Sequence, residues 1–474
     1  MGQTQCFNYK NNRQQTTDYG VSRRGNKKGA SENGYFSDDA SVLSTPRSPY
    51  TPNTVRKKRQ NLISTMMEEN KEDNLQHLFS KRLNFDNFEV IKVIGRGSYA
   101  KVYLIKKYHE TNHELVCYYA LKVLKKKFLH DKNQLHYILQ ERKILMELKH
   151  PFIVEMHYAF QSPDRLYFVL DYVSGGDMFH HIRKKVRFNE KEAKFYAAEI
   201  ILAIEAMHNM GFIYRDIKPE NILIDADGHV RLTDFGLSKH IDDEKNGGKT
   251  STFCGTCQYL APEIILKKGY NKMVDWWGLG ILIHEMIFGQ PPFNDSNNSR
   301  VMGMIIHNDF IPKDWFSKKL QDLLMRLLDK NPLTRLGSQK IGGVASIKNH
   351  SFFEDVNWDA VYKKTWQKPP LKLKVKNSWD TKHIDGAFLN EDIKQTPGQL
   401  EMNSFNVELL NKMHFEDFTY NEESHHLKEK NKKQLDEDLL NDIEYEDEPD
   451  NNEDQHLQSG GKISDNNSLK QEYI

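Results

Sequence analysis

Cysteine is scarce in this sequence, with 4 residues among 474. So few thiols exclude a small disulfide-stapled secreted scaffold and suit a reducing compartment, so we expect a cytoplasmic protein. Cys254 and Cys257 have the C-x-x-C spacing of zinc sites, but no second cysteine pair or nearby histidine completes the four ligands that zinc needs. We therefore predict that no metal is bound at these two cysteines.

Long apolar runs are absent as well. The most apolar stretch, residues 276–289, is too short to cross a bilayer and contains His284 and Glu285, which predicts a buried helix. The first thirty residues have no apolar core, so we expect no secretory signal. The start resembles a myristoylation pattern with Cys6 in place of Ser or Thr. It leaves open a weak membrane association through a lipid on Gly2 or Cys6.

The sequence has no excess of one charge sign, because 67 Lys and Arg oppose 66 Asp and Glu. This balance gives no overall nucleic-acid signature, so we predict no nucleic-acid partner. Both ends are polar: residues 1–84 lack periodic apolar positions, and residues 421–474 are acidic, most strongly between 436 and 454. Their composition predicts disordered tails. The basic run Arg56–Arg59 leaves nuclear entry open.

What the sequence does have is a concentrated polar stretch at residues 215–221, Arg-Asp-Ile-Lys-Pro-Glu-Asn. Pro219 opposes a continuous helix and favours a rigid loop. Phosphoryl transfer needs a carboxylate for the acceptor hydroxyl, a cation beside the moving group and an oxygen ligand for a metal. Asp216, Lys218 and Asn221 supply these three functions, and Asp234, in Asp-Phe-Gly, follows downstream. A polar surface turn is the alternative, which this combination of residues disfavours.

A glycine-rich turn follows the first predicted strand, residues 88–94. Gly95 and Gly97 separate it from a second strand at residues 101–105, so main-chain N–H groups can approach phosphate oxygens without a Cβ in the way. A dinucleotide-binding turn is the alternative, but it requires a helix after the glycines. The β-branched and aromatic residues Val102 and Tyr103 favour a strand instead.

A lysine interrupts the third predicted strand, residues 118–124. Lys122 is costly to bury in this apolar strand unless it has a counter-charge. The following segment, residues 133–148, has Leu135, Ile138, Leu139, Arg142 and Leu145 at three-and-four spacing, which predicts a helix. We expect Glu141 of this helix to pair with Lys122, and an exposed helix acid is the alternative.

The remaining pattern predicts an α+β fold. Two further strands are expected at residues 152–160 and 166–173, and residues 174–176, Ser-Gly-Gly, are interpreted as a flexible connector to a helix capped near Asp177. Helical periodicity then dominates at residues 190–210, 271–288 and 318–329. We therefore expect a small β-rich lobe and a larger helical lobe joined by a short hinge.

Together these motifs resemble the protein-kinase signature set. The matching stretches, in chain order, are residues 95–102, 120–123, 214–221, 234–236 and 261–263. Lys218 within Lys-Pro-Glu-Asn is typical of Ser/Thr kinases, and residues 252–256 with a C-terminal tail narrow the resemblance to the AGC group. The resemblance implies a bilobal protein-kinase fold over residues 88–353 and an AGC tail over residues 354–420.

The resemblance also implies roles for single residues. The catalytic set comprises the base Asp216, its assistants Lys218 and Thr256, and the phosphate-holding pair Lys122 and Glu141. The implied ligands for Mg²⁺ are Asn221 and Asp234. The implied ATP-binding residues are Ile94, Gly95, Arg96, Gly97, Ser98, Tyr99, Ala100, Lys101, Val102 and Lys122, with the hinge residues Asp171 and Val173 and the gatekeeper Leu170. A structural pair is expected between Glu263 and Arg335.

The activation segment carries the first implied regulatory phosphosite, Thr252. A phosphate there would be clamped by Arg215 and Lys239, which would order the segment around the catalytic base. Thr250 and Ser251 are neighbouring hydroxyls, and the register against Gly-Thr at 255–256 selects Thr252.

The tail carries two further implied phosphosites, Thr396 in a turn motif and Thr419 in a hydrophobic motif at residues 415–420. Phe415 and Phe418 are expected to dock on the small lobe beside the predicted helix at residues 133–148. Two aromatic residues stranded in a charged tail are the alternative, which would waste apolar surface.

The implied function is phosphoryl transfer from Mg-ATP to Ser or Thr of protein substrates by a monomeric enzyme under an upstream activating kinase. Asp177, Glu220 and Glu285 match positions that select basic substrates, so Arg or Lys is expected N-terminal to the acceptor. Ala100 replaces the usual third glycine and Tyr214 the commoner histidine, yet neither change removes a catalytic group. The competing class, a non-catalytic kinase-like scaffold, is disfavoured by the intact catalytic set.

Overall fold

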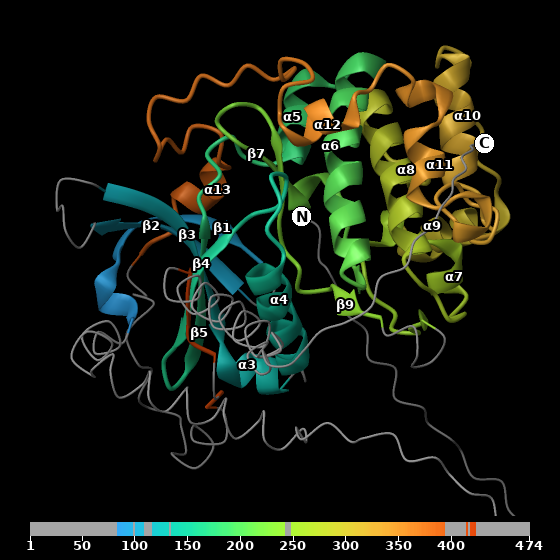
Figure 1. Ribbon diagram of the computed structural model, residues 1–474. Helices are drawn as coiled ribbons and strands as arrows, with labels where there is room; N and C mark the ends of the chain where they lie inside the picture. Colours follow the sequence, from blue (N-terminus) through green and yellow to red (C-terminus); the bar gives the residue numbers. More distant parts are fainter. Residues whose placement is uncertain are drawn as a thin grey trace, which may run out of the picture. The chain divides into compact units, whose positions relative to one another are not determined.

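The computed structural model of the chain describes residues 83–97, 100–108, 116–131, 134–241, 248–393, 414–415 and 418–422 (Figure 1). The expectations for residues 1–82 and 423–474, including the disordered tails and the lipidation pattern, lie outside these ranges. Within the described ranges, no helix has the length and apolarity needed to cross a membrane.

The small lobe is built on a sheet with the strand order β1-β2-β3-β5-β4-β10, whose first five strands pair antiparallel. Its strands are β1 (Glu89–Arg96), β2 (Ala100–Tyr108), β3 (Val116–Lys125), β4 (Met156–Gln161), β5 (Arg165–Asp171) and β10 (Tyr420–Asn421). Its helices are the 3-10 turn η1 (Phe85–Asn87), α3 (Lys126–Asp131) and α4 (Leu135–Glu147). The predicted glycine-rich hairpin is confirmed, because β1 and β2 are adjacent antiparallel strands.

The two faces of β3 bury side chains in different clusters. Leu121 and Val123 belong to a small-lobe cluster, whereas Ala120 and Leu124 belong to the main core together with α4 residues. Because alternate strand residues face opposite sides of a sheet, Lys122 shares its side with Ala120 and Leu124. The strand therefore directs its lysine toward α4.

Several predicted boundaries in this lobe were wrong. The strand predicted from residue 152 begins only at Met156, because residues 152–154 hydrogen-bond to Leu232 instead. Ordered structure starts before the predicted residue 88, since the Asn84 side chain caps η1. On α4, Leu139 was assigned to the apolar face but is 41% exposed.

The large lobe is helical, with short strand pairs near the junction of the lobes. The paired strands are β6 (Phe212–Ile213) with β9 (Lys239–His240), and β7 (Ile222–Ile224) with β8 (Val230–Leu232). The helices up to the tail are α5 (Met178–Lys185), α6 (Glu190–Asn209), η2 (Pro219–Asn221), η4 (Cys257–Tyr259), α7 (Pro262–Ile265), α8 (Met273–Phe288), α9 (Asn298–His307), α10 (Lys318–Leu327), η5 (Gln339–Ile341), α11 (Val344–Lys348) and η6 (Ser351–Phe353). The helices predicted at residues 190–210, 271–288 and 318–329 are present, with ends shifted by one or two residues.

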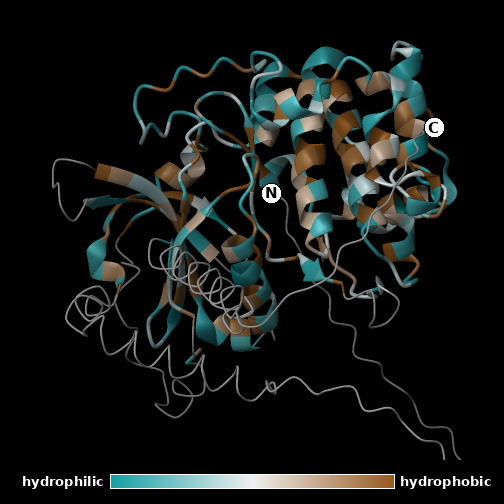
Figure 2. Ribbon diagram, in the orientation of Figure 1, coloured by the Kyte–Doolittle hydropathy of each residue, from teal (hydrophilic) through white to brown (hydrophobic). Residues whose placement is uncertain are grey.

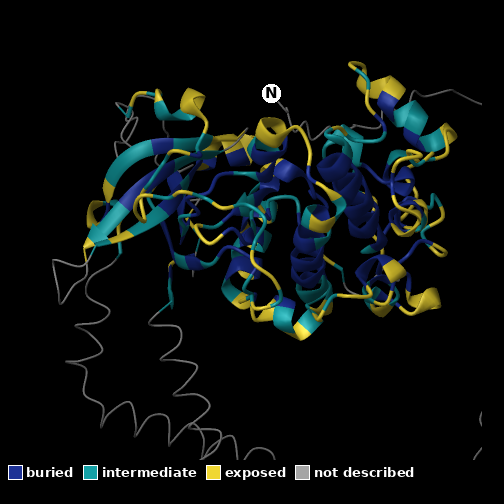
Figure 3. Cartoon of the chain, turned by 90° about the horizontal axis from the view of Figure 1, so that it is seen from above, coloured by how far each residue is buried: buried dark blue, intermediate teal, exposed yellow. Residues whose placement is uncertain are grey.

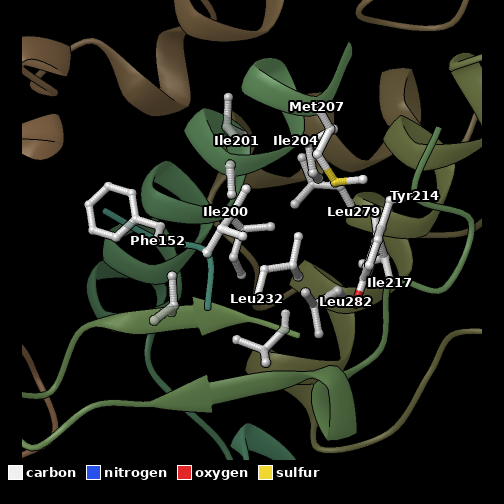
Figure 4. Close-up of a cluster of buried hydrophobic side chains, with 14 of the residues drawn as sticks. Phe152, Ile200, Ile201, Ile204, Met207, Tyr214, Ile217, Leu232, Leu279 and Leu282 are labelled. Carbon is white, nitrogen blue, oxygen red and sulfur yellow. The ribbon is translucent and has the colours of Figure 1, made fainter. Parts of the chain in front are cut away.

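The core of the large lobe lies between α6, α8 and the β7–β8 pair. Hydrophobic residues run along α6 and α8 (Figure 2), and buried residues gather in the middle of this lobe (Figure 3). Tyr214 and Ile217 extend from the loop before η2 into the cluster formed with Ile204, Leu279 and Leu282 (Figure 4). Two buried apolar side chains thus anchor the polar loop that contains Asp216.

The tail continues through α12 (Trp358–Tyr362) and α13 (Gly386–Leu389) and packs on both lobes. Trp366 stacks on Phe195 of α6, and Phe388 packs against the small-lobe cluster. The glycines predicted to form a flexible connector have a different use. A Cβ on Gly175 would lie 2.4 Å from Leu373 Cδ1, and one on Gly176 would lie 2.2 Å from the His383 carbonyl oxygen. These glycines allow close approach of the tail.

Candidate active site

One buried carboxylate, that of Asp275, anchors the loop at residues 214–221. Asp275 of α8 accepts hydrogen bonds from the main-chain N–H groups of Tyr214 (3.0 Å) and Arg215 (2.8 Å). His208 Nε2 lies 2.7 Å from the same side chain. Arg215 has a φ of 67°, which is costly for a residue with a Cβ. Asp275 holds the loop in this conformation, and the sequence analysis did not identify it.

Three of the predicted catalytic residues, Asp216, Lys218 and Thr256, form one hydrogen-bonded group with the predicted metal ligand Asn221. Lys218 Nζ donates to Asp216 Oδ2 at 2.7 Å, and Asn221 Nδ2 donates to the same oxygen at 2.7 Å. Thr256 Oγ1 is 3.4 Å from both Asp216 Oδ1 and Lys218 Nζ. Burial raises the pKa of Asp216, while Lys218 opposes this shift. The result is a fixed carboxylate with increased basicity, as a general base requires.

Lys122 makes the predicted pair and a second one. Its Nζ donates to Glu141 Oε1 at 2.7 Å and to Asp234 Oδ1 at 3.0 Å. Burial alone would lower the pKa of Lys122, but the Asp234 and Glu141 carboxylates outweigh it and raise that pKa. Lys122 in turn lowers the pKa of Asp234, whose side chain is 50% exposed. A cation and an ionised, accessible carboxylate therefore lie side by side.

The two groups adjoin through the segment that precedes Asp234. The main-chain N–H of Thr233 donates to the Asn221 carbonyl at 3.0 Å, and Asp234 has a φ of 60°. The Asn221 amide nitrogen is committed to Asp216, which turns its amide oxygen away from that carboxylate. An amide oxygen and an ionised carboxylate are hard oxygen ligands, and these suit Mg²⁺. The residues present therefore fit the predicted metal.

The glycine-rich turn is only partly described. Gly97 N–H donates to the Ala100 carbonyl at 2.8 Å, and a Cβ at Gly97 would lie 3.8 Å from that oxygen, with no other described residue except its chain neighbours within 4 Å. Ser98 and Tyr99 lie outside the described residues. Two other predicted nucleotide-binding residues use their side chains elsewhere: Lys101 and Arg96 pair with Glu391 of the tail at 2.8 and 3.7 Å.

The hinge residues contribute main chain and apolar surface. Leu170 and Val173 are buried in the main core, and the partly exposed Ile94 and Val102 pack against it. Leu223 of β7 packs there too, and the sequence analysis missed it because nothing local to its strand distinguishes it. The Asp171 carboxylate is bound by His157 and the Glu155 N–H, and its main-chain N–H donates to the Glu155 carbonyl at 3.0 Å, so its own carbonyl is the group left for a base.

Lys239, one of the two cations predicted to clamp a phosphate on Thr252, donates a hydrogen bond to Thr250 at 2.8 Å. Thr250 Oγ1 is 3.5 Å from Thr252 Oγ1, and Tyr270 binds both the Thr252 carbonyl and Arg215. Among the described residues, the buried Arg215 Nη2 finds no hydrogen-bond partner. Burial and then Arg215 lower the pKa of Lys239, which indicates a locally positive site. A phosphate on Thr252 would offset the positive charge of Arg215 and Lys239 and could accept their hydrogen bonds.

Phe415 and Phe418 dock on the small lobe beside α3 and α4, as predicted. Phe418 is buried, lies 5.5 Å from the Phe168 ring, and its carbonyl accepts from Arg142 Nε at 2.9 Å. Gln161 binds the Phe415 main chain through both amide atoms, at 2.6 and 3.2 Å. Thr419 is exposed, and Thr396 lies outside the described residues. Arg142, assigned from its spacing to the packed face of α4, serves as the hydrogen-bond donor that fixes the motif.

Three acidic side chains adjoin the catalytic group. Burial raises the pKa of Glu220, and the negative charge of Asp177 raises it further. The negative charge of Glu220 in turn adds to the raised pKa of Glu285. Burial is the main cause that raises the pKa of Glu285 to about 7, and Tyr259 OH donates to it. Mutual repulsion of this kind favours a cationic partner. The last predicted pair, Glu263 with Arg335, is present in the core of the large lobe at 2.7 Å.

The fold and this site define a protein-kinase domain: the family model described as "Protein kinase domain" matches residues 88–353, and the chain belongs to that family. Its relatives include serine/threonine-protein kinase gad8 of Schizosaccharomyces pombe (44% identity), ribosomal protein S6 kinase alpha-6 of Homo sapiens (43%) and serine/threonine-protein kinase Sgk1 of Gallus gallus (42%). Each match covers 66% of this chain. It covers 53% of gad8, 40% of the S6 kinase and 70% of Sgk1. The predicted resemblance to AGC-group Ser/Thr kinases is thereby confirmed.

Proposed function

We propose that this protein is a serine/threonine protein kinase that transfers the terminal phosphoryl group of ATP to Ser or Thr of other proteins. The observation that carries this proposal is the contact of Lys122 with both Glu141 and Asp234, next to the hydrogen-bonded group of Asp216, Lys218 and Asn221. The Ser/Thr kinases among its relatives support the choice of acceptor.

Each residue has a separate part in the proposed reaction. Asp216 orients the acceptor hydroxyl and accepts its proton, and Lys218 places a positive charge beside the transferred group. Lys122 binds the phosphates of the nucleotide, and Glu141 fixes its position. Bound Mg²⁺, held by Asn221 and Asp234, would supply neutralisation of the phosphate charge. Most of the acceleration would come from positioning and electrostatics.

The test is a phosphorylation assay of the full chain on an oriented peptide library, with Asp216→Asn as the comparison. We expect Asp216→Asn to lower turnover by about 10²- to 10⁴-fold because it removes the base. Equilibrium binding of ATP should change little, since Asp216 is assigned to the acceptor. A variant with the normal rate would refute the assignment. Normal ATP binding without transfer by the wild-type chain would favour a nucleotide-binding scaffold.

We also propose that an upstream kinase activates the protein through Thr252 and that Thr419 strengthens docking of the hydrophobic motif. The unpartnered Arg215 Nη2, with Lys239 nearby, supports the first site, and the buried Phe418 supports the second. Thr252→Ala should reduce activity of protein isolated from activating cells about tenfold or more. Full activity of that variant would contradict the switch, and full activity of Phe415→Ala/Phe418→Ala would contradict the docking role.

The proposal extends to substrates and setting. The acidic group of Asp177, Glu220 and Glu285 supports a preference for Arg or Lys N-terminal to the acceptor. A peptide library that shows no preference for basic residues would contradict it.

We propose a monomeric cytoplasmic enzyme on the basis of its cysteine scarcity and composition. Sedimentation of the purified chain tests the first point. Cell fractionation and an intact mass of the N-terminus test cytoplasmic location against lipid anchoring.

A further inference from the structure

The side chain of Asp171, the first hinge residue, contacts residues of β4 and β8. Asp171 Oδ1 lies 2.9 Å from His157 Nε2, and its Oδ2 accepts from the Glu155 N–H at 3.1 Å. Arg231 Nη1 is 3.5 Å from Oδ2. His157 belongs to β4 and Arg231 to β8, so this carboxylate is held from both lobes at once.

Arg231 continues the contact into the large lobe. Its Nη1 donates to the Ile153 carbonyl at 3.0 Å, which fixes the guanidinium against the segment that precedes β4. Its Nε is buried, has no hydrogen-bond partner in the part of the chain that the structure describes, and lies 3.9 Å from Asp225 Oδ2. The attraction between Arg231 and Asp225 is therefore a charge contact rather than a hydrogen bond, and its strength depends on how Asp225 is placed.

The tail places Asp225. Lys364 Nζ donates to Asp225 Oδ2 at 3.1 Å, and Lys364 follows α12 with a φ of 58°. A long side chain in this left-handed conformation is sparsely populated and persists where the surrounding structure requires it. Lys364 also lies over the Phe152 ring, 5.7 Å from its centroid. The strained residue thus directs its ammonium at the same cluster.

Charges of alternating sign follow this path, Lys364, Asp225, Arg231 and Asp171, and His157 lies against the last of them. We propose that this chain of charges is a positioning network through which the C-terminal tail holds the nucleotide-binding hinge against the large lobe, and that Arg231 is its central positioning residue. The inference rests on the proposed kinase function, because it assigns the main chain of the hinge, residues 171–173, to the nucleotide base.

A purely structural role accounts poorly for this network. The side chains of Arg231, Asp171 and Lys364 are 25%, 21% and 27% exposed, and ion pairs of such exposure contribute little to stability. Their arrangement across β4, the hinge, β8 and the tail instead restricts the geometry of the segment that would bind adenine. Loss of the network should therefore weaken nucleotide binding and leave the phosphoryl-transfer step intact.

The experiment measures the Kd of a nonhydrolysable ATP analogue with Mg²⁺, and kcat and KM for ATP, on the full chain. We expect Arg231→Met to raise Kd and KM about five- to tenfold with kcat within about twofold, since a lost charge-assisted contact costs about one factor of ten. Arg231→Lys should recover part of the loss. Lys364→Met should raise Kd about two- to threefold.

The decisive variant is Arg231→Met/Lys364→Met. If Lys364 acts through Arg231, the double variant should match Arg231→Met alone, whereas independent sites would multiply their effects. The matched control is Lys194→Met, which breaks another ion pair between α6 and the chain after η6, Lys194 with Asp355 at 2.6 Å, and should leave Kd and KM unchanged. If Arg231→Met does not fold, Arg231→Lys with Lys364→Met forms the same cycle.

Three results would overturn the network: unchanged Kd in Arg231→Met, multiplicative effects in the double variant, or an equal rise in Lys194→Met. Melting temperatures of all variants separate loss of folding from loss of binding. The readout also distinguishes the two proposals. A wild-type chain that binds ATP but transfers nothing contradicts the kinase function, while the binding cycle still decides the network.

Discussion

Two buried ion pairs, one in each lobe, have the same chemistry and opposite surroundings. In the large lobe, Arg335 is fully buried and binds both oxygens of Glu263, at 2.7 and 2.9 Å. Its other donors reach the carbonyls of Asp329 and Met273, and the guanidinium lies 5.2 Å from the Trp277 ring centroid. One cation meets one carboxylate, and its donors find acceptors.

In the small lobe, Lys122 serves two carboxylates, Glu141 and Asp234, so the group has an excess negative charge. Glu141 Oε2 is buried and accepts no hydrogen bond from the described residues. Asp234 is half-exposed and has a φ in the left-handed region. Unmatched charge, an unsatisfied oxygen and backbone strain are each unfavourable in the protein alone.

The difference shows which pair stabilises the fold and which one is prepared for a ligand. A satisfied buried pair mainly costs free energy when it is broken. Altering an unsatisfied ion pair costs little free energy of unfolding. Binding of a cation such as Mg²⁺ and of a phosphate stabilises such a pair. Substitutions in the two pairs should therefore separate stability from activity.

The largest effect is expected for Lys122→Met. The substitution removes the cation assigned to the phosphates, so kcat/KM for ATP should fall about 10³-fold. The free energy of unfolding should fall by only about 1–2 kcal/mol, because burial already raises the pKa of Glu141 and favours its neutral form. Steady-state kinetics and chemical denaturation check the two values. A loss of stability as large as that of Arg335→Met would remove the contrast.

Arg335→Met should do the reverse. It leaves the Glu263 carboxylate buried without its partner, so the free energy of unfolding should fall by about 3–5 kcal/mol. The kcat of the protein that remains folded should stay within about threefold of the wild type. Arg326→Met is the matched control, because Arg326 pairs with Asp322 on the exposed face of α10 and should change stability by about 0.5 kcal/mol or less.

The same comparison shows which features of the site could be predicted from the sequence. The pairing of Lys122 with Glu141 followed from the cost of a charge in an apolar strand, and the catalytic loop followed from residue types that one reaction requires. Both arguments are local. Asp275 was missed because an acid in the first turn of an apolar helix reveals its role only when the folded chain sets it against the N–H groups of Tyr214 and Arg215.

Contacts between distant segments account for the other misses. Gly175 and Gly176 were interpreted as flexible because glycine is permissive, but the tail that packs on them follows about 200 residues later in the chain. The start of β4 was misplaced because residues 152–154 have strand-forming side chains but find their hydrogen bonds on β8. The pairing of strands and the close approach of distant segments are determined by tertiary packing, which a local sequence pattern does not reveal.

The smallest effect is expected at Glu285, one of the three acidic residues that we propose select basic substrates. Its pKa is raised to about 7 by burial and by neighbouring Glu220, so the carboxylate is largely neutral at pH 6 and ionised at pH 8. Only the ionised form attracts a basic peptide. The KM for a peptide with Arg before the acceptor should therefore rise about two- to fivefold as the pH falls through 7, while the KM for ATP should not follow.

Glu285→Gln sharpens this prediction, because it keeps the acceptor for Tyr259 and removes the titration. Its KM for the basic peptide should be raised at pH 8 to the value that the wild type shows at pH 6, and it should be flat between them. Replacing Arg in the peptide by the uncharged, similarly shaped citrulline should flatten the wild-type profile too. A pH profile that survives either change would assign the titration to another group and leave Glu285 as a buried structural acid, in the manner of Glu263.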